Sequence, residues 1–251
     1  MEAGESFRAA VPEYRWLLDR GYPGGASLRL VGDRRRLSAE ERLVLFRGVA
    51  SAADSEARRA RIAEAAGGRV ILLDAYNAAF TVVHYLVGKP CFLSTDGLLR
   101  DAGANYGRVP REELLSRAFG ELAQAAREAG AAAVEAWLDA PVSRSAAHAA
   151  ALRAALEAAG LPSRVELARS ADGAILARLR EASGRGEAAA GGGQAPARTA
   201  VPPLVASSDS AIADRAAEVF DLARRLLAAR YGAAFLDLGA LAEGELAEGA
   251  P

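Results

Sequence analysis

The sequence has few residues of the kinds that form disulfides or zinc sites, and it has no long apolar run. Its 251 residues include one cysteine, Cys91, and two histidines, His84 and His148. One cysteine excludes a disulfide within the chain, and these three side chains are too few for the usual four-ligand zinc site. Runs of about 18 uncharged apolar residues are missing, so we expect no transmembrane helix and no membrane partner. Because residues 1–16 also lack the apolar stretch of a signal peptide, we expect a cytoplasmic protein.

A net excess of positive charge is also missing. The chain has 31 Lys and Arg against 32 Asp and Glu, so overall basicity gives no argument for a nucleic-acid partner. Residues 28–62 nevertheless hold nine arginines against five acids and could follow an RNA backbone. This segment offers no evident platform on which bases could stack, and a solvated surface is the simpler interpretation of its charge.

Residues 1–66 predict a small helical domain without strands. Apolar residues recur at helical spacing near the start and stop at Gly21, which predicts a first helix. Ser38 stands three residues before Glu41, the spacing of a capping box, in which the hydroxyl and the carboxylate each accept a backbone N–H bond. We therefore expect a second helix after Ser38 and a third over 55–66.

From residue 67 the pattern changes to short apolar runs that alternate with longer amphipathic ones, which is typical of βαβ units and a parallel sheet. We predict an α/β domain over 67–240 with a mostly parallel five-stranded sheet. Strands are expected near 69–74, 90–95, 132–139, 164–168 and 203–207, with a short edge strand over 233–239. Residues 183–203, rich in Gly, Ala and Pro, predict a flexible insertion, and 241–251 a disordered tail.

Five aspartates stand at or just after the ends of apolar runs, and they are the main functional clue. Strands that run in one direction bring their last residues to the same edge of a sheet, where ligands usually bind. Carboxylates held together there raise one another's pKa, and a divalent cation such as Mg2+ or Mn2+ is the common compensation. We predict a metal site formed by some or all of Asp74, Asp96, Asp139, Asp172 and Asp209.

Three of these aspartates lie in motifs that resemble those of a nuclease superfamily. VILLDAYNAAF, LARSADGAIL and PLVASSDSAI, in this order, are similar to motifs of the NYN branch of PIN-like nucleases, over residues 69–231. The resemblance implies a PIN-like, Rossmann-like sheet whose acids bind Mg2+ or Mn2+ and hydrolyse RNA phosphodiesters. It implies catalytic, metal-binding roles for Asp74, Asp172 and Asp209, with Asn77 nearby. Ala75 departs from the pattern, because NYN proteins commonly have Gly there.

The chain also resembles a second family. LDRGYP, LVGDRRRLSAEER and FRGV near the start, taken with the acidic α/β part, look like an uncharacterised prokaryotic family of unknown function, number 434. This resemblance implies no activity. It implies that the helical part and the α/β part belong together.

Each candidate residue also has a structural interpretation. An aspartate after a strand is a favoured N-cap for the next helix, so capping and metal binding both stay open for the five aspartates. Asp96, Asp101 and Asp139 rank as supporting or second-metal ligands. The candidates for substrate contacts are Asn77, Ser207, Ser208 and Arg144, with capping as the alternative for the serines and solvated surface for Arg144. We expect His84 in or beside the core and His148 exposed.

Three functional hypotheses follow. The first is a metal-dependent endoribonuclease with RNA as its substrate. The second is a catalytically inactive PIN-like module that binds nucleic acid or protein, and Ala75 motivates it. The third is a phosphohydrolase of small phosphate esters, which ranks last because the chain lacks the DxD acid pair typical of haloacid-dehalogenase-like phosphatases.

Overall fold

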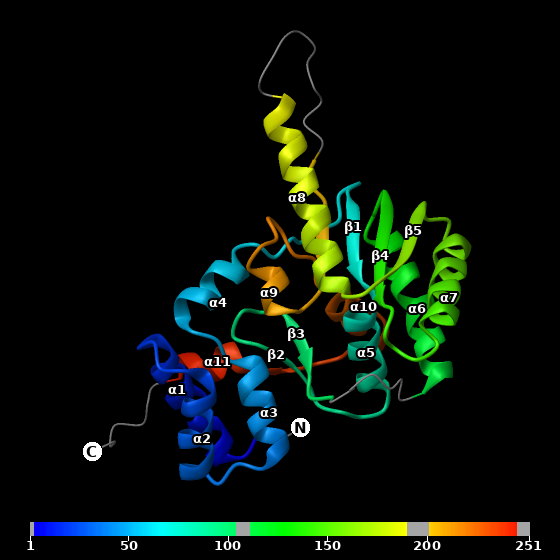
Figure 1. Cartoon of the computed structure of the whole chain (residues 1–251). Helices are drawn as coiled ribbons and strands as arrows, with labels where there is room; N and C mark the ends of the chain where they lie inside the picture. The colour runs from blue at the N-terminus through cyan, green and yellow to red at the C-terminus, as the bar shows by residue number, and fades with distance from the viewer. Residues whose placement is uncertain (1–2, 104–110, 190–200, 245–251) are drawn as a thin grey trace. The chain divides into compact units, whose positions relative to one another are not determined.

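The computed structural model describes residues 3–103, 111–189 and 201–244, which form two compact units. The first unit takes in residues 1–60, 84–104 and 232–251, and the second takes in 61–83 and 105–231. Figure 1 labels the elements of both units. Neither unit is a continuous stretch of chain, whereas the sequence pattern predicted a single boundary after residue 66.

Four helices open the first unit. They are α1 (Glu5–Asp19), α2 (Gly24–Arg34), α3 (Ala39–Gly48) and α4 (Ala52–Arg59). The predicted capping box is confirmed at α3: Ser38 Oγ accepts the Glu41 N–H at 3.2 Å, and Glu41 Oε2 accepts the Ser38 N–H at 2.8 Å. The helix predicted over 55–66 is shifted, because Ser51 caps α4 and the helix ends at Arg59.

The helix α2 is not indicated by any pattern in the sequence. Its first residues, Gly24 and Gly25, are poor helix formers and follow Pro23, so the segment has the composition of a loop. Packing against α1 compensates for the weak local preference. It buries Val31, and Arg35 after the helix donates to Glu13 of α1 at 3.0 Å.

A three-stranded sheet completes the first unit. Its order is β3-β2-β7, with β2 (Cys91–Leu93), β3 (Leu99–Asp101) and β7 (Leu236–Asp237), and α11 (Leu238–Glu243) follows β7. The strand β2 runs antiparallel to β3 and parallel to β7. The core of the unit includes Phe7, Tyr14, Leu45, Phe92 and Leu238. The strand predicted near 90–95 therefore lies outside the parallel sheet, and the predicted edge strand over 233–239 is the short β7.

The second unit is built on a four-stranded parallel sheet. Its order is β5-β4-β1-β6, with β1 (Val70–Asp74), β4 (Ala133–Asp139), β5 (Ser163–Ala168) and β6 (Leu204–Ala206). All three pairings are parallel. Numbered along the chain within this sheet, the strands stand in the order 3-2-1-4, which is that of the first four strands of a doubly wound α/β sheet. The predicted parallel α/β architecture is confirmed, with four strands in this sheet instead of five.

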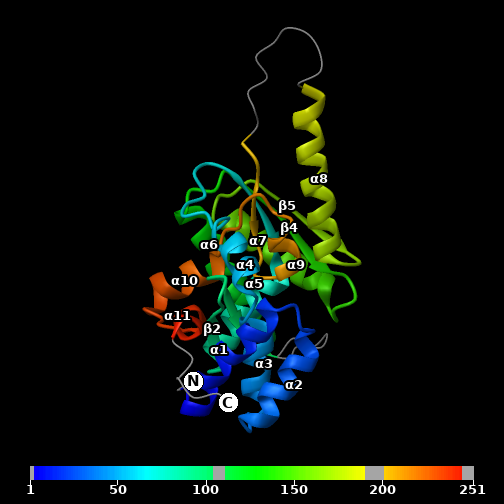
Figure 2. The ribbon, with the colours of Figure 1, turned by 90° about the vertical axis from the view of Figure 1, so that its left-hand side faces the viewer.

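Helices cover this sheet (Figures 1 and 2). They are α5 (Ala75–Leu86), α6 (Glu112–Glu128), α7 (Ser145–Ala158), α8 (Ala171–Ala189), α9 (Ser210–Ala213) and α10 (Leu222–Tyr231). The helices α6 and α7 pack on each other, α7 also contacts β4 and β5, and α8 contacts β1 and β4. Leu115, Phe119 and Leu122 of α6 are buried at helical spacing, as an amphipathic helix with one apolar face requires.

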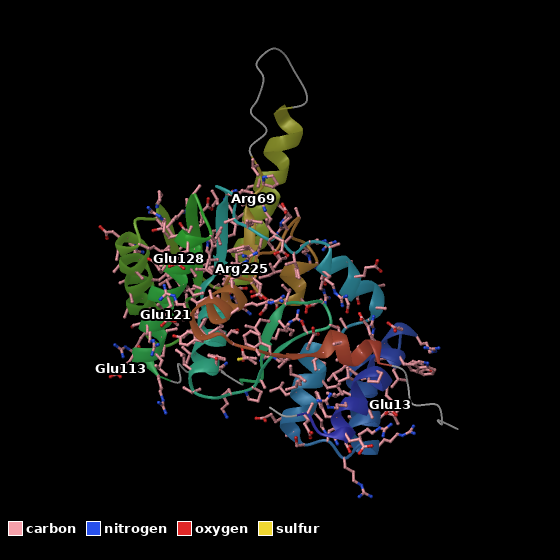
Figure 3. All side chains as sticks on the ribbon, turned by 180° about the vertical axis from the view of Figure 1, so that it is seen from behind. Glu13, Arg69, Glu113, Glu121, Glu128 and Arg225 are labelled. Carbon is pink, nitrogen blue, oxygen red and sulfur yellow. The ribbon has the colours of Figure 1, made fainter. Side chains whose placement is uncertain are left out.

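Polar side chains link α6 to α10 at the surface of the second unit. The Tyr231 hydroxyl donates to the Glu121 carboxylate at 2.7 Å, and Arg117 Nη2 donates to the Tyr231 oxygen at 2.8 Å. Figure 3 shows Glu121 and Glu128 along α6. Exposed ion pairs contribute about 0–1 kcal/mol each, so the apolar faces supply most of the stability of this packing.

Two segments predicted to be flexible are partly helical. The helix α8 continues to Ala189, inside the predicted insertion at 183–203, and α11 continues to Glu243, inside the predicted tail at 241–251. Residues 190–200 and 245–251 lie outside the described part of the chain. Among the described residues, no helix is both long and apolar enough to cross a membrane.

A substitution at Gly48, at the end of α3, tests how tightly the core of the first unit is packed. A Cβ atom at this position would overlap a Leu238 methyl group and stand 2.7 Å from the Phe92 ring. We expect Gly48→Ala to lower the free energy of unfolding by about 1–3 kcal/mol, because a filled core must shift to admit a methyl group. Gly25→Ala is the matched control: its methyl group meets nothing within 4 Å and should stabilise α2 by roughly 0.5–1 kcal/mol. Equal effects in urea unfolding would contradict this packing.

Candidate acidic site at the carboxyl edge of the parallel sheet

Four of the five predicted aspartates meet at one edge of the parallel sheet. Asp74 ends β1 and Asp139 ends β4, while Asp172 lies in the first turn of α8 and Asp209 directly precedes α9. The negative charges of Asp172 and Asp139 raise the pKa of Asp74, and those of Asp209 and Asp139 raise the pKa of Asp172. These four side chains therefore lie at one edge of the sheet, near enough to act on one another electrostatically.

The position of this edge agrees with the topology of the sheet. After β1 the chain builds β4 and β5 on one side, and it then returns to place β6 on the other side of β1. Doubly wound sheets bind ligands at such a switch point, beyond the carboxyl ends of the two strands. Asp74 and Asp209 follow the two strands that flank it.

Asp74 is the buried member of the group, with 4% of its surface exposed. Burial, followed by the charge of Asp172, raises its pKa from 3.8 to about 7. Two hydrogen bonds oppose this rise: the Ser207 hydroxyl donates to Oδ2 at 3.1 Å, and the Asn77 N–H donates to Oδ1 at 3.3 Å. The Asp74 carboxyl therefore changes between its protonated and ionised forms near neutral pH.

Asp172 lies at the exposed rim of the group. Desolvation raises its pKa, as do the charges of Asp209 and Asp139, while a hydrogen bond from the Asp74 carboxyl partly offsets the rise. Two carboxyl groups in hydrogen-bonding contact cannot both be ionised without cost. Ionisation of one of these two carboxyl groups therefore opposes ionisation of the other.

Asp139 and Asp209 each use one oxygen to accept N–H groups from the first turn of a helix. Asp209 Oδ1 accepts the N–H groups of Ala211 and Ile212 at 2.8 and 3.2 Å, and Asp139 Oδ1 accepts the Ala171 N–H at 2.9 Å. The capping interpretation is confirmed for Asp209. Asp139 does not cap α7, the helix that follows β4, and instead accepts a bond from the first residue of α8. These bonds do not replace the site interpretation, because both carboxylates also act electrostatically on Asp172.

Three predicted substrate-contacting residues join the loops that carry the aspartates. Asn77 Oδ1 accepts the Ser208 N–H at 2.9 Å and the Ser208 hydroxyl at 3.1 Å. The Ser207 hydroxyl, which donates to Asp74, accepts the Asp209 N–H at 3.2 Å. These bonds tie the start of α5 to the loop after β6 and orient the two carboxylates.

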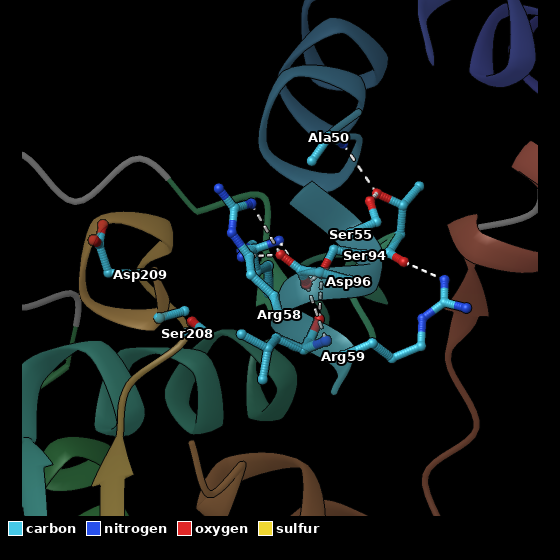
Figure 4. A network of polar contacts seen from close by, with 12 residues as sticks. Ala50, Ser55, Arg58, Arg59, Ser94, Asp96, Ser208 and Asp209 are labelled. Atoms are coloured by element: carbon cyan, nitrogen blue, oxygen red, sulfur yellow. Dashed lines mark hydrogen bonds and ion pairs between the residues drawn. The ribbon is translucent and has the colours of Figure 1, made fainter. Parts of the chain in front are cut away.

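Asp96 does not belong to this group, and the expectation that it would lie at the same sheet edge is wrong. It lies between β2 and β3 in the first unit, with no exposed surface (Figure 4). Arg100 Nη2 donates to its Oδ2 at 2.8 Å and Arg58 Nη1 at 3.3 Å, and the Ser94 hydroxyl donates to Oδ1. Burial alone would raise the pKa of Asp96, but Arg100 first, then Ser94 and the Leu98 N–H, hold it below its ordinary value.

Asp101 and His84 contact each other in the first unit, whereas His148 is buried in the second. Asp101 also lies in the first unit, where its Oδ1 is 2.7 Å from Nδ1 of His84, which is buried as expected. The prediction of an exposed His148 is wrong, because only 4% of its surface is exposed. Its ring contacts Tyr76 and Glu112, and sequence spacing gave no signal for this contact because the three residues come from separate helices.

Arginine side chains proposed to contact a phosphate or an RNA backbone pair largely with acids. Arg144 caps α7 in a left-handed conformation, with φ 61°, and its guanidinium is 3.3 Å from Glu112. Five of the nine arginines in 28–62 form ion pairs within the first unit: Arg35 with Glu13, Arg42 with Asp33, Arg47 with Asp101, Arg58 with Asp96 and Arg59 with Glu243. These contacts favour a structural role for much of that charge.

The arrangement of the acids limits what the site can hold as it stands. Among the described residues, no three Asp, Glu, His or Cys side chains are grouped closely enough to bind one metal ion. The four carboxylates influence one another's charge without converging on one point.

The raised pKa of Asp74 makes stability depend on pH. Its pKa is near 3.8 in the unfolded chain and about 7 in the folded one, so the folded protein binds the proton more tightly. The free energy of unfolding should fall as pH rises through this window, and the penalty is complete above about pH 7. Asp74→Asn should therefore exceed the wild type in melting temperature near pH 8 and lose that advantage near pH 4. A difference independent of pH would contradict the assignment.

Comparison with known proteins places the chain among proteins of unknown function. A family described as Protein of unknown function (DUF434) matches residues 6–61, the part that carries LDRGYP and LVGDRRRLSAEER. The protein of Methanocaldococcus jannaschii named Uncharacterized protein MJ0935 is 25% identical over 169 residues, which cover 66% of this chain and 81% of that protein. No solved structure matches significantly. The model of the Domain of unknown function (DUF5616) matches residues 63–225, which is more than half of the 251 residues, and the chain belongs to that family.

Proposed function

We propose that the chain is a metal-dependent phosphodiesterase of PIN-like fold that hydrolyses RNA. The observation that carries the proposal is the buried Asp74 carboxyl, with a pKa of about 7, inside a group of four aspartates at the switch point of a parallel sheet. Ionisation of this buried carboxyl opposes folding, so the need for a stable fold does not explain why the group is present. The DxYN, ADxxI and SDxxI motifs support the same activity by resemblance.

The chemistry of the side chains fits a hard divalent cation. Asp74, Asp172 and Asp209 would hold Mg2+ or Mn2+ through carboxylate oxygens, the ligands that these ions prefer, and Asp139 would support a second ion. Such ions supply a lowered pKa for bound water and offset charge on the phosphoryl oxygens. No three-ligand group is preformed among the described residues, so the carboxylates would have to move closer together to complete the ligand set.

The remaining residues of the site position the acids. Ser207 and the Asn77 N–H hold the two oxygens of Asp74 in fixed directions. The bonds from Ser208 to Asn77 fix the distance between the loops after β1 and β6. In this proposal, Asp74 from the end of β1 and Asp209 from the loop after β6 would bind the same cation.

A second candidate is a PIN-like module that binds nucleic acid or protein without hydrolysis. The absence of a preformed three-ligand cluster among the described residues favours it. So does Ala75, which is fully buried at the start of α5 where a glycine is common in the resembling family. Binding of RNA without added metal, together with no turnover, would select this candidate.

Hydrolysis of mixed RNA oligonucleotides with Mn2+, Mg2+ or EDTA tests the first candidate. We expect turnover only with metal, and a loss of roughly 100-fold or more in Asp74→Asn and Asp209→Asn, as for other preorganised electrostatic groups. Asparagine is as good an N-cap as aspartate, so Asp209→Asn removes the charge while α9 keeps its cap. Asp33→Asn, an exposed aspartate of the first unit, is the control. Equal cleavage by the wild type and both site variants would reveal a contaminating nuclease and overturn the proposal.

Binding of the cation should also displace a proton. Because the pKa of Asp74 is about 7, the Mn2+ affinity should increase between about pH 6 and pH 8. Calorimetry in two buffers of different ionisation enthalpy measures the released proton directly. Asp74→Asn should bind more weakly and with little dependence on pH. Binding by the wild type without proton release would show that the cation does not contact Asp74.

A further inference from the structure

The strand β5 lies at one end of the parallel sheet, with one of its edges turned outward. It is the last strand in the order β5-β4-β1-β6 (Figure 1). Its even-numbered residues bond to β4, as the bond from the Ala140 N–H to the Ala168 carbonyl shows. The N–H and C=O groups of Ser163, Val165 and Leu167 therefore point away from the sheet. In the described part of the chain, no second strand pairs with this edge.

This outer edge keeps the groups that another strand needs. Proteins usually block an open edge with a proline, a bulge or a covering segment, but β5 has six residues and no proline. One side chain reaches the edge: Arg153 Nη2 of α7 donates to the Val165 carbonyl at 3.1 Å. That oxygen has a second lone pair and can still accept another bond. Leu167 is 42% exposed, so the edge also has an apolar side chain to bury.

The two charged side chains of β5 make the strand complementary to itself. Arg164 and Glu166 lie on one face of the strand, 2.6 Å apart, with exposed fractions of 62% and 39%. Two copies of β5 can pair antiparallel about a twofold axis at Val165. Arg164 then lies opposite Glu166 of the second copy, and Glu166 lies opposite Arg164 of that copy. Opposite charges directly across a strand pair stabilise the pairing.

The charges also select this register over its neighbours. Residues that point outward must face one another to form the ladder, so the second strand can slip only in steps of two residues. A slip in one direction places Arg164 opposite itself, and a slip in the other direction places Glu166 opposite itself. Like charges directly opposite each other are destabilising. In the register centred on Val165, Leu167 lies diagonally across from Val165 of the second copy, within reach of an apolar contact.

We propose that the outer edge of β5 is a self-association surface, at which two copies of the chain join their four-stranded parallel sheets into one continuous sheet. The partner is a second copy because the charge pattern of β5 is matched by its own sequence in antiparallel orientation. This inference goes beyond the proposed function, and it requires neither metal binding nor hydrolysis.

Sedimentation equilibrium of the full chain over a concentration series tests the inference. We expect a reversible dimer for the wild type. Arg164→Glu and Glu166→Arg should each weaken dimerisation about tenfold or more, because each places like charges opposite each other at two positions. An equal mixture of the two variants should dimerise about as tightly as the wild type. In that mixture, two acidic positions of one chain face two basic positions of the other.

Two further variants separate edge pairing from a general effect of charge or folding. Arg29→Glu makes the same charge change at an exposed position of the first unit and should dimerise as the wild type does. Leu167→Pro removes an outward N–H that β4 does not use, a position at which edge strands tolerate proline. It should melt as the wild type does and fail to dimerise. A wild type that stays monomeric, a mixture of the charge variants that stays monomeric, or a dimer that survives both charge reversals would overturn the inference.

Discussion

Burial of the Asp74 carboxyl beside other carboxyl groups is the constraint on which the acidic edge of the second unit depends. Asp74 is buried, and its described surroundings supply hydroxyl and N–H dipoles and further carboxylates. Asp96 is equally buried but lies between two guanidinium groups, and its pKa moves in the opposite direction. Because their environments differ, Asp96 has a structural role and Asp74 has a candidate functional role. The paired Asp96 stabilises its turn, whereas ionisation of Asp74 opposes folding.

Features that depend on local chemistry were predictable from the sequence. The capping box at Ser38 needs only residues three positions apart, and it is present. The strands that end in Asp74 and Asp139 and their parallel direction followed from alternation of short apolar runs with helices. The convergence of four aspartates followed in turn, because parallel strands deliver their ends to one edge.

Features that depend on pairing between distant segments were not predictable in the same way. The apolar run ending near Asp96 has the composition of a sheet strand, but β2 pairs with β3 and β7, and this choice depends on tertiary packing. His148 lies in an alanine-rich helix whose pattern suggests exposure, and only the fold shows that Glu112 and Tyr76 enclose it. The helix α2 begins with two glycines, so its existence depends on α1.

Each compact unit is built from separate segments of the chain, and this has a consequence for the evolution of such proteins. One family match ends at residue 61 and the other begins at residue 63, yet Phe92 and Leu238, which fill the core of the helical unit, come from far beyond that point. A gene that encoded only the helical segment would produce a polypeptide with these two positions empty, and the loss of large core side chains is costly. The two segments should therefore descend together as one evolutionary unit, and gene fusion or shuffling at their sequence border should be selected against.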